Sequence, residues 1–295
     1  MNIVYFTKGQ RGSVCLAHIL KKGYNVIAVI GVVQENEVDR LAKEYGYPVL
    51  LMEKINSPDS VQQLKELGAD LFVLCGYNKI IKKQVIEIPP LGTINLHGGK
   101  LPEYRGAAPI NWQIINGETS GGCSIIYVDE GIDTGDIISQ VIYDIEPEDT
   151  HASILEKTLE IFPGMLAQVL EQIENGTVQA QKQDPLAGSY FSRRYPRDSM
   201  IDWGELTDIE VYNLVRGMHG PYPAAFTFRG NTKVEIDRTL LLEETINGIP
   251  GRVPQKRGNH VVVLARNRGL VIEEITVDGE KMVPSAFFKV GDDLG

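Results

Sequence analysis

The first half of the chain alternates short apolar runs with segments whose apolar residues recur every three to four positions. The apolar runs predict strands at residues 2–7, 25–33, 48–52, 70–76, 92–97, 124–128 and 137–145. The periodic segments predict helices at residues 13–22, 35–45, 57–67, 85–88, 108–116 and 151–173. Because the strands are apolar nearly throughout, we expect an α/β fold with a mostly parallel sheet that helices cover on both faces.

The pattern changes after about residue 185. One more helix is predicted at residues 208–219, and short β-like runs separated by turn residues follow at 225–228, 232–236, 251–253, 260–265 and 269–275. This spacing predicts a small all-β barrel or sandwich. We therefore expect a first domain at residues 1–185, a linker at 186–204 and a C-terminal β domain at 205–295.

Composition is that of an ordinary globular protein, with 43% hydrophobic and 23% charged residues among 295. The longest notable apolar run, residues 26–33, is far shorter than the roughly 20 residues that span a bilayer. The N-terminus shows no basic segment before an apolar stretch, so we expect no secretory signal, no membrane partner and a cytoplasmic location. The widely spaced Cys15, Cys75 and Cys123 favour a reducing compartment and buried thiols.

The formal net charge is −10, from 29 basic and 39 acidic residues. This balance argues against a nucleic-acid partner, although a local basic patch could still bind one. Residues 8–13 lack the G-x-G-x-x-G pattern, so bound NAD is not expected, and Gly9 belongs either to a turn or to a backbone cradle for another phosphate. The five histidines lack metal-ligand spacing, so no metal is expected, and no G-x-S-x-G elbow indicates a serine nucleophile.

Asn95 and His97 are polar residues at the end of an otherwise apolar predicted strand. Being two positions apart, they emerge on one face, and ligands of open α/β sheets bind beyond the carboxyl ends of strands. An amide and an imidazole there could stabilise an oxyanion and move a proton. Asp133, in a glycine-flanked loop, could orient the imidazole. The alternative is a hydrogen-bonded pair in the core.

Three ordered stretches carry a family resemblance. They are Asn-Leu-His at 95–97, Leu-Pro-Glu-Tyr-Arg-Gly-Ala-Ala-Pro-Ile at 101–110 and Asp-Glu-Gly-Ile-Asp-Thr-Gly-Asp at 129–136. The chain resembles the formyltransferases that use 10-formyltetrahydrofolate. The resemblance implies a Rossmann-like formyltransferase domain followed by an OB-like β-barrel, with 10-formyltetrahydrofolate as co-substrate. It also implies that Asn95, His97 and Asp133 are catalytic.

Further site residues are expected on the loops around this strand, although several could equally be core or bracing residues. Those expected to line the cofactor cleft are Tyr77, Asn78, Lys79, Ile80, Ile81, Val128, Asp129, Gly131 and Asp133. Those expected to bind the acceptor are Gly9, Lys79, Gly98, Gly99, Tyr104, Arg105, Arg193 and Arg194. Arginine is suited to a pyrophosphate because its guanidinium presents a fork of donors.

The acceptor divides the family. Methionyl-tRNA formyltransferases share the two-domain plan but usually carry a longer basic insertion after the second strand, whereas residues 34–37 here are short and acidic. Residues 97–106 and 190–203 resemble the nucleotide-sugar N-formyltransferases. We therefore expect a nucleotide-linked 3-amino or 4-amino deoxysugar as acceptor, with UDP favoured, for surface polysaccharide; the alternative is methionyl-tRNA.

Two other branches fit less well. The glycinamide ribonucleotide enzymes are similar to the first domain only, and formyltetrahydrofolate hydrolases carry a regulatory domain upstream, whereas Met1 here begins the first strand. A ligand-binding module without catalysis is disfavoured, because all three polar residues of the resemblance are present. The C-terminal strands could pair subunits in a homodimer.

Overall fold

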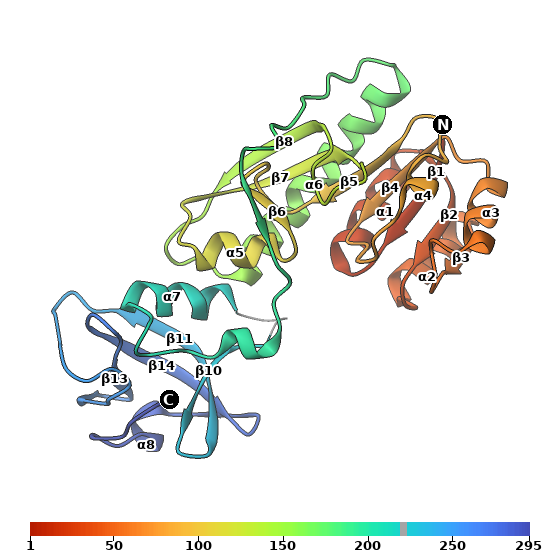
Figure 1. Cartoon of the computed structure of the whole chain (residues 1–295). Helices are drawn as coiled ribbons and strands as arrows, with labels where there is room; N and C mark the ends of the chain where they lie inside the picture. Colours follow the sequence, from red (N-terminus) through yellow and green to blue (C-terminus); the bar gives the residue numbers. More distant parts are fainter. Residues whose placement is uncertain (219–222) are drawn as a thin grey trace. The chain divides into compact units, whose positions relative to one another are not determined.

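The computed structural model describes residues 1–218 and 223–295, which divide into two compact units (Figure 1). The first comprises Met1–Gly106, Gly121–Tyr143 and Glu156–Phe191. The second comprises Ala107–Ser120, Asp144–Leu155 and Ser192–Gly295. The second unit thus takes in two segments that lie inside the predicted first domain. The boundaries at residues 185 and 205 stay predictions, and His219, the predicted end of a helix, lies outside the described residues.

The first unit contains a seven-stranded sheet in the order β3-β2-β1-β4-β5-β7-β8. Its strands are β1 (Asn2–Thr7), β2 (Asn25–Gly31), β3 (Val49–Leu51), β4 (Leu71–Cys75), β5 (Thr93–His97), β7 (Ser120–Tyr127) and β8 (Ile137–Asp144). The first five pair in parallel, and β7 runs antiparallel to β5. Because the chain winds outward from β1 in one direction and from β4 in the other, the sheet has a switch point where such folds bind ligands.

Helices alternate with or follow these strands in the sequence. They are α1 (Gln10–Lys21), α2 (Asn36–Tyr45), α3 (Pro58–Glu66), α4 (Lys83–Ile86) and α6 (His151–Glu174). Ser57 caps α3 by accepting a hydrogen bond from the Ser60 amide, and Pro58 opens the helix. Phe6 of β1 and Phe72 of β4 are fully buried in one apolar cluster with side chains from α3 and α4. The expected α/β fold is confirmed, and the three cysteines are free and buried.

The glycines of β7 explain one wrong boundary. The strand begins at Ser120, four residues before the predicted start. A Cβ at Gly121 would lie 2.5 Å from the Tyr143 ring, and one at Gly122 would lie 2.8 Å from the Lys100 Cα. Glycine is therefore needed here because neighbouring chain comes close, not because the chain turns. Two short strands were also not predicted, β6 (Tyr104–Gly106) and β9 (Ser189–Phe191), which pair in parallel.

The second unit contains an antiparallel sheet in the order β10-β11-β14-β13-β12, with β15 against β14. The strands are β10 (Ala225–Arg229), β11 (Thr232–Leu241), β12 (Gln255–Arg257), β13 (His260–Leu264), β14 (Gly269–Val277) and β15 (Glu280–Met282). The helical segments are α5 (Pro109–Ile115), η1 (Pro196–Ser199), α7 (Asp208–Gly217) and α8 (Pro284–Phe287). The expected C-terminal antiparallel β domain is confirmed.

Contacts between distant segments close the second unit. Asn111 of α5 donates a 2.7 Å hydrogen bond to the Gly217 carbonyl at the end of α7, and Trp203 is buried in the core of the sheet. The strand predicted at 251–253 is wrong, because β12 begins at Gln255. Gly251 has φ 80°, and a Cβ there would lie 2.4 Å from the Leu294 carbonyl, so the chain turns against the C-terminal segment instead. Among the helices described, none is both long enough and apolar enough to cross a bilayer.

Candidate active site

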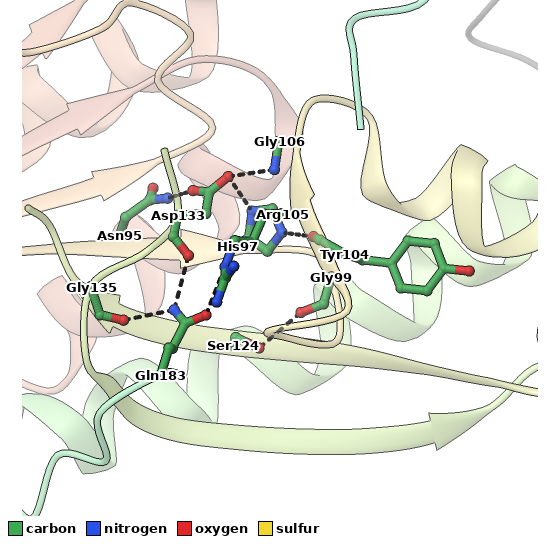
Figure 2. A network of polar contacts seen from close by, with 10 residues as sticks. All are labelled: Asn95, His97, Gly99, Tyr104, Arg105, Gly106, Ser124, Asp133, Gly135 and Gln183. Atoms are coloured by element: carbon green, nitrogen blue, oxygen red, sulfur yellow. Dashed lines mark hydrogen bonds and ion pairs between the residues drawn. The ribbon is translucent and has the colours of Figure 1, made fainter. Parts of the chain in front are cut away.

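Two side chains of β5 and one from the loop between β7 and β8 meet at the carboxyl end of the sheet (Figure 2). Asn95 Nδ2 lies 3.4 Å from Asp133 Oδ1, and His97 Nδ1 lies 3.5 Å from Asp133 Oδ2. The side chains of His97 and Asp133 are only 6% and 14% exposed. The structure thus brings together the three residues predicted to be catalytic, and that role itself stays a prediction.

His97 is held on both sides by proton acceptors. Its Nε2 donates a 2.6 Å hydrogen bond to the Tyr104 carbonyl, because a carbonyl oxygen can only accept. Its Nδ1 faces the carboxylate of Asp133. With a proton on Nε2, Nδ1 is the ring nitrogen that can accept a further proton, beside the carboxylate of Asp133.

The backbone around Asp133 is unusual and sets the direction of its carboxylate. Asp133 has φ 54°, in the left-handed region that aspartate tolerates better than most residues. The Gly106 amide donates a 2.9 Å hydrogen bond to Asp133 Oδ2. At Gly135 a Cβ would lie 1.8 Å from the Tyr127 carbonyl, so only glycine fits this return of the loop.

A glutamine that the sequence did not single out holds the same loop. Gln183 Nε2 donates to the carbonyl oxygens of Asp133, at 2.9 Å, and Gly135, at 2.7 Å. Its Oε1 accepts a 3.0 Å hydrogen bond from Arg105 Nε (Figure 2). Gln183 was missed because it lies in a segment with neither periodicity nor a motif, where a glutamine carries no signal.

The two loops predicted to line the cofactor cleft share one apolar wall. Tyr77 and Val128 both pack against the buried cluster of the first unit. Lys83 Nζ forms a 2.9 Å ion pair with Glu130 Oε1, which ties the second loop to α4. Within the described part of the chain the buried Tyr77 hydroxyl has no hydrogen-bond partner, and burial raises the pKa of Tyr77 to about 12. An unpartnered hydroxyl on an apolar wall suits a heterocyclic ligand with polar edges.

The other residues predicted in these loops differ in placement. Asn78 and Ile80 are exposed, whereas Ile81 is buried. Lys79 Nζ donates to the carbonyl oxygens of residues 52 and 53, at 2.9 and 2.7 Å, so its ammonium holds the chain after β3. A ligand contact of these four residues stays a prediction.

The start of the loop between β7 and β8 is held by its own polar contacts. Asp129 Oδ1 accepts hydrogen bonds from the Gly131 amide at 3.0 Å and from Thr134 Oγ1 at 2.7 Å. A Cβ at Gly131 would lie 2.0 Å from Thr134 Oγ1, so this turn also needs glycine. These contacts fix the conformation of the loop, and the cofactor contacts of Asp129 and Gly131 remain predictions.

The predicted acceptor residues fall into separate groups. Gly98 and Gly99 are buried directly after His97, and Ser124 Oγ donates to the Gly99 carbonyl at 2.8 Å. The amide of Gly9, which precedes α1, donates to a carboxylate oxygen of Glu35 at 2.8 Å. This contact engages the amide that the phosphate cradle would use.

Tyr104 and Arg105 have the contacts of bracing residues. The Tyr104 ring stacks on Phe191 with centroids 4.8 Å apart, and the Arg105 guanidinium binds Gln183 and neighbouring carbonyl oxygens. Arg193 and Arg194 belong to the second unit, where Arg193 is exposed and Arg194 lies over the Trp112 ring at 4.7 Å. Acceptor contacts of these residues stay predictions.

Within residues 1–218 and 223–295, no three His, Cys, Asp or Glu side chains are grouped so that they could hold a metal ion. The proton donors and acceptors found here are an amide, an imidazole and a carboxylate that meet at the carboxyl end of β5. Such a set at the carboxyl end of a sheet is suited to acyl transfer, in which an oxyanion forms and a proton moves.

Comparison with known proteins identifies the family. Residues 1–170 match the family model described as formyl transferase, and residues 194–291 match that described as formyl transferase, C-terminal domain. The chain therefore belongs to the formyl transferase family and is a folate-dependent N-formyltransferase with 10-formyltetrahydrofolate as co-substrate. The expected family, enzyme class and formyl donor are confirmed.

Relatives with this architecture carry two kinds of name. A methionyl-tRNA formyltransferase of Ruminiclostridium cellulolyticum is 33% identical over 95% of this chain and 93% of its own length. One of Fusobacterium nucleatum is 36% identical over 79% and 77%. The crystal structure of WlaRD, a sugar 3N-formyl transferase with dTDP and 5-N-formyl-tetrahydrofolate, superposes with a TM-score of 0.67 at 20% identity, covering 95% and 98%. At that identity the structural likeness shows the fold alone.

The predicted nucleotide-sugar acceptor is therefore wrong, as is the expectation that a nucleic-acid partner is unlikely. Residues 97–106 follow directly on β5, the strand that carries Asn95 and His97, so a resemblance there does not report the acceptor. Net charge failed for a different reason: it averages over the whole chain, whereas binding of a polyanion depends on local charge.

Proposed function

We propose that this chain transfers the formyl group of 10-formyltetrahydrofolate to the amino group of methionyl-tRNA. The observation that carries the proposal is the 29–36% identity to methionyl-tRNA formyltransferases over most of both chains. The two-unit architecture and the cluster of Asn95, His97 and Asp133 at the sheet edge are consistent with it.

In the proposed reaction the methionyl nitrogen attacks the formyl carbon, and the carbon–nitrogen bond to N10 of the folate breaks. One proton leaves the attacking nitrogen and one is gained by N10. Asn95 Nδ2, which lies 3.4 Å from Asp133 Oδ1, donates to the oxyanion of the tetrahedral intermediate. His97, whose Nε2 donates to the Tyr104 carbonyl, takes up the leaving proton at Nδ1 and passes it to N10, and Asp133, 3.5 Å from that nitrogen, stabilises the imidazolium formed in this step.

The formyl donor would bind beside the wall formed by Tyr77 and Val128. Both side chains pack on one apolar cluster, and the unpartnered Tyr77 hydroxyl within the described chain supplies a polar contact for the edge of a pterin ring. The backbone groups of residues 77–81 and 128–131 would provide further hydrogen bonds. This position of the formyl donor is supported by the packing of Tyr77 and Val128, one from each predicted loop, on the same apolar cluster.

Contacts to the tRNA backbone are proposed for the arginine-rich segment 193–197. Arg193 is exposed, and the side chain of Arg197, whose Nε lies 3.6 Å from Asp198 Oδ1, is 86% exposed, so phosphates can approach both guanidinium groups. Arg194 stacks on Trp112, an arrangement that also suits an unpaired base. A local basic segment in a chain of net charge −10 reconciles the proposed partner with the composition.

The proposal is tested by incubating the purified chain with 10-formyltetrahydrofolate and, separately, methionyl-tRNA and a panel of amino-sugar nucleotides. We expect one formyl group to be added to methionyl-tRNA only, and we expect His97→Ala to abolish the addition. Formylation of an amino sugar without formylation of methionyl-tRNA would refute the proposed acceptor. A cytoplasmic location and a homodimer remain predictions.

A further inference from the structure

We propose that Gln183 is a positioning residue for formyl transfer, which acts by holding the loop that carries Asp133. This inference rests on the catalytic role proposed for Asp133. The side-chain amide of Gln183 makes three hydrogen bonds, two as a donor to the carbonyl oxygens of Asp133 and Gly135 and one as an acceptor from Arg105. Its contacts therefore join the loop after β7 to strand β6.

The orientation of this amide is determined by its partners. Carbonyl oxygens can only accept, so the nitrogen of Gln183 must face Asp133 and Gly135. The guanidinium of Arg105 can only donate, so the oxygen must face Arg105. A glutamate at this position would satisfy Arg105 but would turn an acceptor oxygen towards two carbonyl oxygens.

Arg105, which binds the Gln183 oxygen, is itself held in place by further hydrogen bonds. It is 8% exposed, and its two terminal nitrogens donate to the carbonyl oxygens of Ala187 and Asp184, at 3.0 and 3.1 Å. The backbone of β6 also pairs with β9, with Arg105 opposite Tyr190. The segment that carries Gln183 is thus bound to β6 both through side chains and through backbone.

The consequence for Asp133 follows from its backbone. Asp133 has φ 54°, a conformation that persists only when its surroundings hold it. Gln183 binds the carbonyl oxygen of this residue and that of Gly135, two positions on, while Gly106 at the end of β6 binds its carboxylate. Together these contacts set where Asp133 Oδ2 stands, 3.5 Å from His97 Nδ1. A displacement of about 1 Å at such a site costs up to about 100-fold in rate.

The test compares Gln183→Glu with Gln181→Glu, which makes the same charge change two residues away on an exposed side chain. We expect Gln183→Glu to lower kcat by about 10- to 100-fold. The KM for 10-formyltetrahydrofolate should change less than about threefold, because the substitution removes no contact with the formyl donor. We expect Gln181→Glu to leave both constants unchanged. Gln183→Met, which keeps the volume and adds no charge, should lower kcat in the same way, and melting temperatures establish that each variant is folded.

The second readout is the ¹⁵N NMR signal of the His97 ring nitrogens, which requires no acceptor and so separates this proposal from that of the tRNA substrate. We expect the signal to shift in both Gln183 variants and to remain in place in Gln181→Glu. A loss of kcat without a shift would overturn the route through Asp133, and a shift without a loss of kcat would overturn the positioning role. Failure of the wild-type chain on methionyl-tRNA, with the shifts as expected, would refute only the acceptor.

Discussion

Replacing Asp133 by asparagine isolates the contribution of one negative charge. The substitution keeps the size of the side chain, and asparagine tolerates the left-handed φ of 54° at this position. Once His97 has taken up the proton in the proposed reaction, its charge lies 3.5 Å from Asp133 Oδ2, and two unit charges at this distance attract by about 5 kcal/mol at an effective dielectric constant of about 20. Because the two side chains are 6% and 14% exposed, water screens this attraction only in part.

That attraction sets an upper bound on the rate effect. At about 1.4 kcal/mol per factor of ten, 5 kcal/mol corresponds to about 4 × 10³-fold. We therefore expect Asp133→Asn to lower kcat by about 10²- to 10³-fold, measured as tetrahydrofolate release at saturating donor and acceptor, while the melting temperature changes little. The control is Asp136→Asn, which removes the same charge from the same loop. An Asp133→Asn variant that keeps kcat within about threefold of wild type, or a control that loses as much, would refute the reasoning.

Three further predictions test packing, burial and charge. Gly135→Ala places a Cβ 1.8 Å from the Tyr127 carbonyl, so the free energy of unfolding measured in urea should fall by at least about 2 kcal/mol. In Gly164→Ala the new Cβ lies in open space on α6, so the free energy of unfolding should rise by about 0.5–1 kcal/mol. Burial raises the pKa of Tyr77 to about 12, because it disfavours the ionised phenol in the folded chain. The contribution of Tyr77 to stability is therefore complete below the unfolded pKa of about 10 and is lost as the pH rises towards 12. Tyr77→Phe should lessen this alkaline loss of stability, and an unchanged pH profile of stability would contradict the prediction. Arg197→Ala should weaken tRNA binding and reduce the slope of log affinity against log salt by about one; an unchanged slope would place the phosphate contacts elsewhere.

Much of the first unit could be predicted from local pattern. Apolar runs such as β1 and β4 are buried on both faces, so their residues carry no alternation, and this is the signal of a central parallel strand. Boundaries failed where glycine had a role set by distant neighbours. Gly121 lies outside the strand predicted at 124–128, yet the structure places it inside β7, where the Tyr143 ring occupies the space of a Cβ.

The site shows the same division. Asn95 and His97 could be paired from sequence because a strand places residues two apart on one face. Asp133 could be suggested from its glycine-flanked loop, but only the family resemblance joined it to the other two, since nothing local reveals what a loop 36 residues further on will touch. Gln183 escaped both routes, because its importance lies in contacts with Arg105 and with the Asp133 loop that exist only in the folded chain.

The sequence by itself determined the fold class, the formyltransferase chemistry and the formyl donor, because these depend on periodic patterns and on motifs that recur in order along the chain. The tertiary structure alone decided how the carboxylate of Asp133 is held and which acceptors flank His97. The physical reason is that periodicity reports a residue's own element and its burial. The position of a polar side chain, in contrast, depends on hydrogen bonds to groups tens of residues away, which no local pattern records.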